Sequence, residues 1–302
     1  MALYGIQKST YYDWLKRPGK EPRPRRNLFA LLPEEEQAIL NFRKFHPQVN
    51  YRSFAHMLND AKVAYASESA IYQLLKRNNC LQPANTVAND ATAKEYKNKP
   101  QHVHHHWHMD IAYIKIRGTF YFLVMMLDGY SRFILDWELM PDMLGQSVED
   151  FTVRVKEKYP FAHPILITDN GSQFISLDFK KLLARLDIQH ARTRRNHPQT
   201  NGKIERLNGI VKNEAIKPNA PTSFSEAWDI LNEYVYFYNY QRLHSGINYL
   251  RPADMFFGRN NLILTNRKNN VTLARNIRVA ANKARLDPSL ISDSQPSENS
   301  KA

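Results

Sequence analysis

The sequence predicts a mixed α/β domain preceded by an all-α region. Three runs of β-branched and aromatic residues, separated by short turns, have the pattern of an antiparallel meander, at 109–116, 119–128 and 131–139. After them, apolar segments of strand and helix character alternate, which is typical of a sheet flanked by helices. Before residue 84 the apolar residues recur mainly at helical spacing.

The N-terminal region, residues 1–83, is expected to contain short helices, placed at 8–16, 33–45, 51–58 and about 67–77. Proline at the first helical position and three following glutamates support the start at Pro33. Three short helices with a turn between the last two suggest a DNA-binding helix-turn-helix region. A plain helical bundle used for protein contacts is the alternative, because Lys76 and Arg77 are few charges for reading DNA.

A polar stretch without periodicity, residues 84–103, predicts a linker between this region and a domain at 104–258. Within that domain the meander is followed by expected elements in the order helix, strand, helix, strand, helix, at 146–158, 164–168, 177–186, 188–191 and from about 200. Residues 259–302 form a basic extension. Its first part, 259–285, holds seven Lys or Arg and no acid, which suggests phosphate contacts, and its end is expected to be disordered.

The composition favours an intracellular protein with a polyanionic partner. Forty-two Lys and Arg against 29 Asp and Glu give a net charge of +13, which attracts nucleic acid, although a basic solvated surface is the alternative. One cysteine, Cys80, excludes an internal disulfide framework, and no apolar run has the length of a membrane span. We therefore expect a cytoplasmic protein; the family resemblance described below implies a bacterial cytoplasm and association with the nucleoid.

Three carboxylates occupy positions where hard metal ligands would be expected. Asp169 follows the apolar run 165–167 in "TDNGSQF", Asp110 lies in the first strand, and Glu205 lies in "NGKIERLNGIVK". A single acid at a strand end is more often a turn former or a solvated charge. Three together are what two-metal phosphodiester chemistry needs, since water and phosphate supply the remaining ligands.

The spacing and the motifs around these acids carry a family resemblance. Thirty-five residues separate Asp169 from Glu205, and "TDNGSQF" and "HPQTNGKIERLNGIVK" resemble the OrfB-type transposases of bacterial insertion sequences. Residues 104–258 resemble the D,D-35-E catalytic core that these transposases share with retroviral integrases. The resemblance implies a ribonuclease-H-like fold and an enzyme, a DDE polynucleotidyl transferase. It also implies Mg²⁺, with Mn²⁺ as a substitute, bound by Asp110, Asp169 and Glu205.

The same resemblance implies a transposase that binds element ends and target DNA, cuts a strand and transfers the freed 3′-OH. We expect a homo-oligomer on DNA, with an upstream-frame subunit or fusion as a further partner. Lys212, two helical turns after Glu205, would hold a phosphate. The other expected DNA contacts are Arg192, Arg194, Arg195, Asn201, Lys203 and Asn208, for which solvated arginines and surface amides are the alternatives.

Two further motifs have open roles. His102, His104, His106 and His108 alternate, so a strand would place them on one face with Asp110; a zinc site is disfavoured because its ligands usually come from separated segments. The segment with Asn239, Arg242 and His244 matches the family's terminal motif and is expected to pack the last helix or to steady Glu205.

Two other functions are compatible with parts of the sequence. A non-catalytic DNA-binding regulator derived from a transposase would keep the helices, but the intact set of three acids argues against it. A ribonuclease or junction nuclease would use the same fold, but the 35-residue spacing and the N-terminal helices argue against that class.

Overall fold

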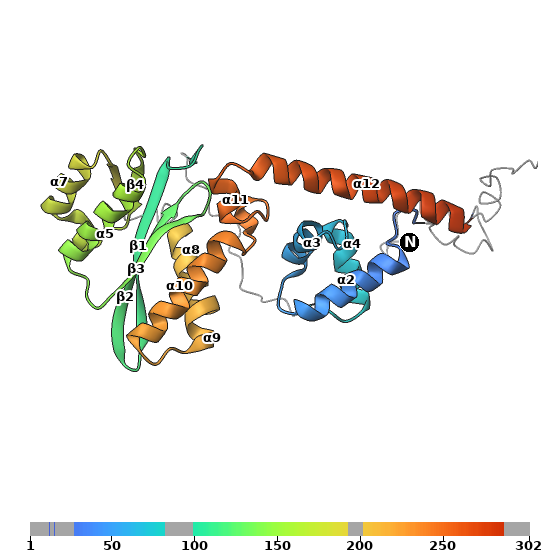
Figure 1. Cartoon of the computed structure of the whole chain (residues 1–302), viewed down its shortest axis with the longest axis horizontal. Helices are drawn as coiled ribbons and strands as arrows, with labels where there is room; N and C mark the ends of the chain where they lie inside the picture. The colour runs from blue at the N-terminus through green and yellow to red at the C-terminus, as the bar shows by residue number, and fades with distance from the viewer. Residues whose placement is uncertain (1–11, 13–14, 16–26, 82–98, 193–201, 287–302) are drawn as a thin grey trace, which may run out of the picture.

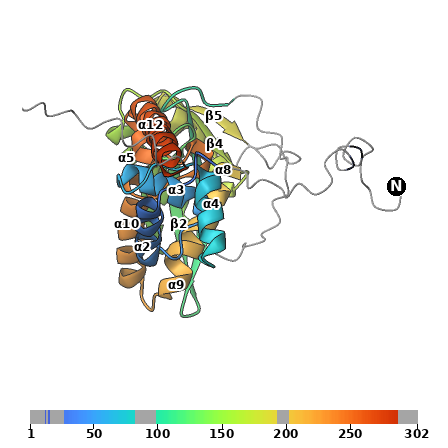
Figure 2. The same cartoon turned by 90° about the vertical axis from the view of Figure 1, so that its right-hand side faces the viewer.

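The computed structural model describes residues 12, 15, 27–81, 99–192 and 202–286. They form an elongated molecule with an α/β part at one end and a small helical part at the other (Figure 1). A long C-terminal helix, α12 (Asn260–Leu286), leaves the α/β part and runs along the helical part. The two views agree on this placement, with α12 above the N-terminal helices in both (Figure 2).

A five-stranded sheet in the order β3-β2-β1-β4-β5 forms the centre of the α/β part. Its strands are β1 (His106–Ile116), β2 (Thr119–Asp128), β3 (Ile134–Met140), β4 (Ile165–Thr168) and β5 (Gln189–Arg192). The first three strands pair antiparallel, whereas β4 pairs parallel with both β1 and β5. This mixed sheet confirms the predicted ribonuclease-H-like class.

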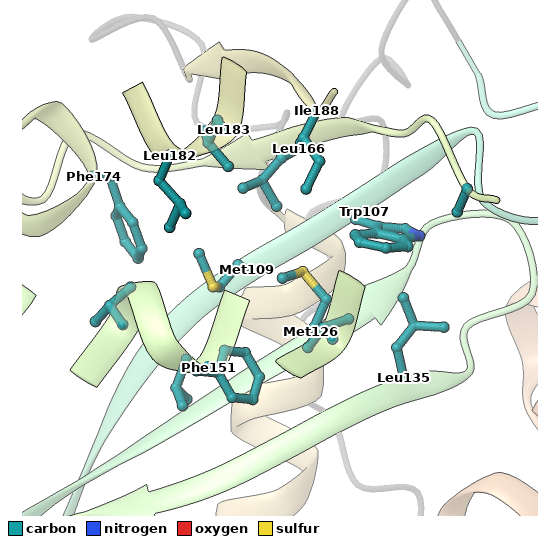
Figure 3. Packing of buried hydrophobic residues seen from close by; sticks show 14 of the residues in the cluster. Trp107, Met109, Met126, Leu135, Phe151, Leu166, Phe174, Leu182, Leu183 and Ile188 are labelled. Carbon is teal, nitrogen blue, oxygen red and sulfur yellow. The ribbon is translucent and has the colours of Figure 1, made fainter. Parts of the chain in front are cut away.

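Helices cover both faces of the sheet, and alternate residues of β1 show this division. Trp107 and Met109 point into one core, which is completed by α5 (Gly145–Lys158), α6 (Ser172–Ile175) and α7 (Leu177–Arg185) (Figure 3). Ala112 and Ile114 point into a second core on the other face. That face is covered by α8 (Gly202–Val211), η3 (Lys212–Ile216) and α10 (Phe224–Tyr240), and the short helix α9 (Lys217–Asn219) connects η3 to α10. Short elements η4 (Ser245–Ile247) and α11 (Pro252–Phe256) follow.

The helical part consists of α2 (Pro33–Phe45), α3 (Tyr51–Asp60) and α4 (Glu68–Arg77) around their own apolar core. Asn50 and Ser67 cap the last two helices by accepting a hydrogen bond from the backbone three residues on, at 3.0 and 3.3 Å. The predicted helix at 8–16 lies outside the described residues except for two of its positions. No described helix is long and apolar enough to cross a membrane.

The basic segment after residue 259 was expected to contact phosphates. In the structure most of it is one helix, α12, that packs on the helical part. Arg278 pairs with Glu35 at 2.7 and 2.8 Å, and Arg267 pairs with Asp60. Because this segment contains no Asp or Glu, its positive charge predicts a surface that contacts phosphates. Two of its arginines are instead buried against acids more than 200 residues away along the chain.

Asn239 of α10 closes the free edge of the sheet. Its side-chain oxygen accepts from the Ile134 backbone N–H at 2.9 Å, and its amide donates to the Ile134 carbonyl at 3.0 Å. Both groups are buried, and β3 has a strand neighbour on one side only. The amide therefore pairs with the edge strand as a neighbouring strand would.

We predict that Asn239→Ala lowers the free energy of unfolding by roughly 1–3 kcal/mol, because it leaves the buried N–H and C=O of Ile134 unpaired. Urea denaturation measures the loss. Asn232→Ala, an exposed asparagine on the same helix, is the matched control and should change stability by less than about 0.5 kcal/mol. Equal stability of the two variants would contradict the role of Asn239 at the edge.

Candidate active site

The parallel pairing of β1 with β4 brings two of the three acids together. The paired residues end with His108 opposite Ile167, so Asp110 and Asp169 each lie two positions beyond this pair. Side chains alternate along a strand with a period of two, so Asp110 leaves the sheet on the same face as His108. Asp169 follows directly after β4, at the end of the strand beside β1.

The loop after β4 fixes the Asp169 carboxylate. Its Oδ1 accepts from the Gly171 backbone N–H at 2.9 Å. A Cβ added at Gly171 would lie 2.7 Å from the Gln173 amide nitrogen and 3.1 Å from this carboxylate oxygen, so a larger residue here would displace the Gln173 side chain and crowd the Asp169 carboxylate. On the strand side, the Thr168 hydroxyl lies 3.0 Å from His190 Nε2 of β5.

Helix α8 carries the third acid and is anchored on β1. Ile204 and Leu207 of α8 are buried in the same core as Ala112 of β1. The buried Asn208 donates from Nδ2 to Asp110 Oδ2 at 2.8 Å. Glu205 is exposed in the first turn of α8, three residues before Asn208, so it lies on the helix face that meets Asp110.

The electrostatics of Asp110 reflect this crowding of negative charge. Burial, together with the charges of Asp169 and Glu205, raises the pKa of Asp110 to about 6. In the described part of the chain, no three His, Cys, Asp or Glu side chains converge closely enough to hold a metal ion. The three carboxylates are therefore electrostatic neighbours that do not form a closed ligand cluster.

The histidine segment departs from the predicted alternation. β1 begins at His106, and His104 has a positive φ of 64°, so residues 102–105 form a turn in place of a strand. His108 is buried in β1, and neither of its ring nitrogens has a hydrogen-bond partner among the described residues. Burial, with Lys203 and Arg132 nearby, lowers the pKa of His108 well below its usual value. Its ring fills the space beside Gly129, where an added Cβ would lie 2.8 Å from Nε2.

Four of the residues expected to contact DNA fall in the described part. Arg192 is exposed at the end of β5, opposite Thr168, and lies at the rim of the candidate site. Lys212 is half-buried at the start of η3. Lys203 donates to the Gly129 carbonyl at 3.2 Å, and Asn208 contacts Asp110, so both make contacts within the protein that the sequence did not predict. The remaining expected contacts, Arg194, Arg195 and Asn201, lie outside the described residues.

The terminal motif braces the helix that carries Glu205. Arg242 donates to both carboxylate oxygens of Glu214 at 2.7 and 2.8 Å, and the Tyr234 hydroxyl donates to one of them at 2.8 Å. Glu214 lies in η3, a π-helical turn that continues α8. Such turns recur at functional sites and were not predicted here. Burial, with Arg132 and Arg242 nearby, lowers the pKa of His244 to about 3.

Comparison with known proteins identifies the α/β part. Two family models, both described as integrase core domain, match residues 100–198 and 186–252, together about half of the chain. The transposase for insertion sequence element IS904 of Lactococcus lactis is 29% identical over 150 residues, 49% of this chain and 59% of that protein. The chain belongs to the integrase-core family.

Two other known proteins match a larger share of the chain. The 31 kDa protein of insertion element IS600 from Shigella sonnei is 22% identical over 270 residues, 83% of this chain and 95% of that protein. The catalytic core of HTLV-2 integrase, solved with magnesium, covers 52% of this chain and 99% of its own at 20% identity and a TM-score of 0.41. The chain spans less than two thirds of the length of the IS904 relative.

We predict that Asp110→Asn stabilises the protein at neutral pH when divalent ions are absent. A carboxyl whose pKa rises from 3.8 to about 6 on folding keeps its proton in the folded state where the unfolded chain has lost it. Its contribution to stability is fully present below pH 4 and is lost as the pH rises to about 6. The variant avoids this loss, which is at most ~3 kcal/mol for such a shift.

Urea denaturation with EDTA at pH 4 and pH 7 measures the difference. The free energy of unfolding of the variant, relative to that of the wild type, should be higher at pH 7 than at pH 4. Asp229→Asn, an exposed acid on α10, is the control and should follow the wild type. A gain that is the same at both pH values would show that the carboxyl of Asp110 is not responsible.

Proposed function

We propose that the protein is a DNA transposase that cleaves a DNA strand at element ends and transfers the resulting 3′-OH to target DNA. The observation that carries this proposal is the β1–β4 register, which sets Asp110 beside the strand end that bears Asp169. Membership of the integrase-core family supports the same reaction class. A non-catalytic regulator would have no need for a buried carboxylate held at a raised pKa.

The three acids fit a divalent cation by their chemistry. All are hard oxygen donors. Burial, and to a lesser degree repulsion by Asp169 and Glu205, raises the pKa of Asp110, and a bound positive charge would offset both effects. A bound Mg²⁺ would neutralise these carboxylates and polarise the phosphodiester and the attacking oxygen. We propose Asp110, Asp169 and Glu205 as the ligands, with Mn²⁺ as a functional substitute.

The protein's own contribution is to hold these acids in place. Asn208 orients the Asp110 carboxylate and ties α8 to β1 through one hydrogen bond. The Gly171 N–H orients Asp169. Glu205 is exposed, so it is free to approach a ligand from the α8 side. Preorganisation of this kind lowers the barrier because less rearrangement is needed when the substrate binds.

DNA is the proposed partner, and the basic residues at the rim of the site are the proposed phosphate contacts. Arg192 lies at the end of β5, beside the strand that leads to Asp169, and Lys212 lies two turns after Glu205 on the same helix. Phosphate contacts of this kind position DNA without reading its sequence. A reaction that joins two element ends to one target also favours a homo-oligomer on DNA.

We predict that Asp169→Asn abolishes end cleavage, by at least about 10²-fold, and leaves DNA binding nearly unchanged, because it removes ligand charge and keeps the side-chain shape. Incubation with labelled element-end DNA and Mg²⁺ followed by mapping of 3′ nicks measures cleavage, and a gel-shift assay measures binding. Asp229→Asn is the control. If wild-type protein bound ends but never cut them, the regulator would replace the enzyme as the proposed function.

We predict that Lys212→Ala weakens binding equally on end and random DNA and reduces the magnitude of the salt slope by about one, as for one lost phosphate contact. Lys217→Ala removes the same charge five residues later, where the ammonium donates to Asn213, and should leave the slope unchanged. Titrations of both DNAs at several salt concentrations measure the slope. Identical slopes for the two variants would place Lys212 away from the DNA.

A further inference from the structure

Arg267 joins three separate parts of the molecule through one buried guanidinium. It lies on α12 and is 6% exposed. Its Nε and Nη2 donate to the two carboxylate oxygens of Asp60, the last residue of α3, at 2.8 and 2.6 Å. Its Nη1 donates to the carbonyl of Tyr249 at 3.0 Å and points to that of Asn248 at 3.4 Å. Thus α12, the helical part and the integrase core meet at this side chain.

The turn that Arg267 contacts is held in an unusual conformation. Asn248 and Tyr249 both have positive φ values, 57° and 54°. A left-handed conformation is rare for a tyrosine and persists only where its surroundings enforce it. Here both carbonyls face the guanidinium, and the Tyr249 ring stacks on His56 of α3 with centroids 4.7 Å apart and planes at 19°. The turn is therefore fitted to this junction.

The helical part is fastened to α12 independently of Arg267. Further along the helix, Arg278 pairs with Glu35 and also donates to the Tyr65 carbonyl at 2.8 Å. Asn282 donates to the carbonyls of Leu28 and Ala30 at 3.1 and 3.0 Å. Helices α2–α4 also have their own apolar core. Loss of the Arg267 contacts would therefore leave the helical part folded and bound to α12, and would loosen its junction with the core, where the stacking of His56 on Tyr249 would remain.

We propose that Arg267 is a positioning residue that fixes the helical part relative to the catalytic carboxylates and so determines which phosphodiester is cut. This rests on the proposed function and on the helical part binding the element end. Successive phosphates of one strand advance by about 3.4 Å along the helix axis and are rotated about it, so a small combined shift and rotation at the junction would present a neighbouring phosphodiester to Asp110 and Asp169. A guanidinium with bidentate and carbonyl contacts restrains such displacement more than a lysine ammonium would.

The test maps cleavage positions on element-end DNA for Arg267→Met and for Lys268→Met. Both variants remove one positive charge from the same turn of α12, and Lys268 is exposed. We expect Lys268→Met to cut at the wild-type phosphodiester. Arg267→Met should spread cleavage over neighbouring positions, with total nicking of random DNA within about twofold of wild type. A purely structural role would lower all cleavage together without moving its position.

A second variant guards against misfolding, because Arg267→Met leaves the Asp60 charge without its partner. Asp60→Asn/Arg267→Met removes both charges and should spread cleavage in the same way. Hydrogen exchange should show α2–α4 still protected in both variants. Cleavage by both variants at the single wild-type position, with an unchanged preference for ends, would overturn the proposal.

A measurement without activity separates this proposal from the proposed function. Small-angle scattering of the free proteins should fit one arrangement for wild type and Lys268→Met, and should require several for the two Arg267 variants. Wild-type protein that never cuts ends would refute the proposed function and, with it, the role of Arg267 in choosing the cut. Scattering curves that are identical for all four proteins would refute the junction itself.

Discussion

The parallel pairing of β1 with β4 is the constraint on which the candidate site depends. β1 is the middle strand, antiparallel to β2 on one side and parallel to β4 on the other. If β1 slipped by one residue relative to β4, the side chains of β1 would change faces, and Asp110 would point to the opposite face of the sheet. That face is filled by α5 and α7, far from the helix that carries Glu205. One strand pairing therefore decides whether the three acids can act together.

Charge is distributed unevenly around this pairing. The site gathers carboxylates in a chain of net charge +13, so it is a local reversal in a field that attracts polyanions. Lys203, two residues before Glu205, is only partly available to a substrate, since it donates to a backbone carbonyl. In the basic C-terminal segment, Arg267 and Arg278 likewise form ion pairs within the protein. Net charge overstates how many cations face a ligand.

The sequence predicted the fold of the α/β part well, because its signals are local. The three meander strands, the helix from Gly145 and the helix from Pro33 lie where periodicity and capping residues placed them. The three acids follow from their motifs, yet their mutual geometry depends on the β1–β4 register, which no local pattern encodes. Nor could a local pattern show that Asn208 would turn inward to Asp110. The only local indication was its position three residues after Glu205, which places both side chains on the same face of α8.

The largest omission concerns contacts between distant segments. Helix α12 contains no acids that could pair with its own arginines. No local pattern therefore indicates that Asp60 and Glu35 form ion pairs with them. The π turn at η3 was missed for the same reason, since it is held by Arg242, 28 residues from Glu214. The histidine segment was misjudged because a left-handed residue, His104, interrupts the apparent alternation.

The docking of α12 on the helical part also affects the order in which the chain can fold during synthesis. Helices α2–α4 leave the ribosome early and can bury their own apolar core, but Asp60 must wait for a partner 207 residues later. In that interval the entire integrase core is made and can fold. A nascent chain can therefore form its integrase core before its N-terminal helices are fixed to α12. Translation of α12 is the step that completes the junction between the two parts.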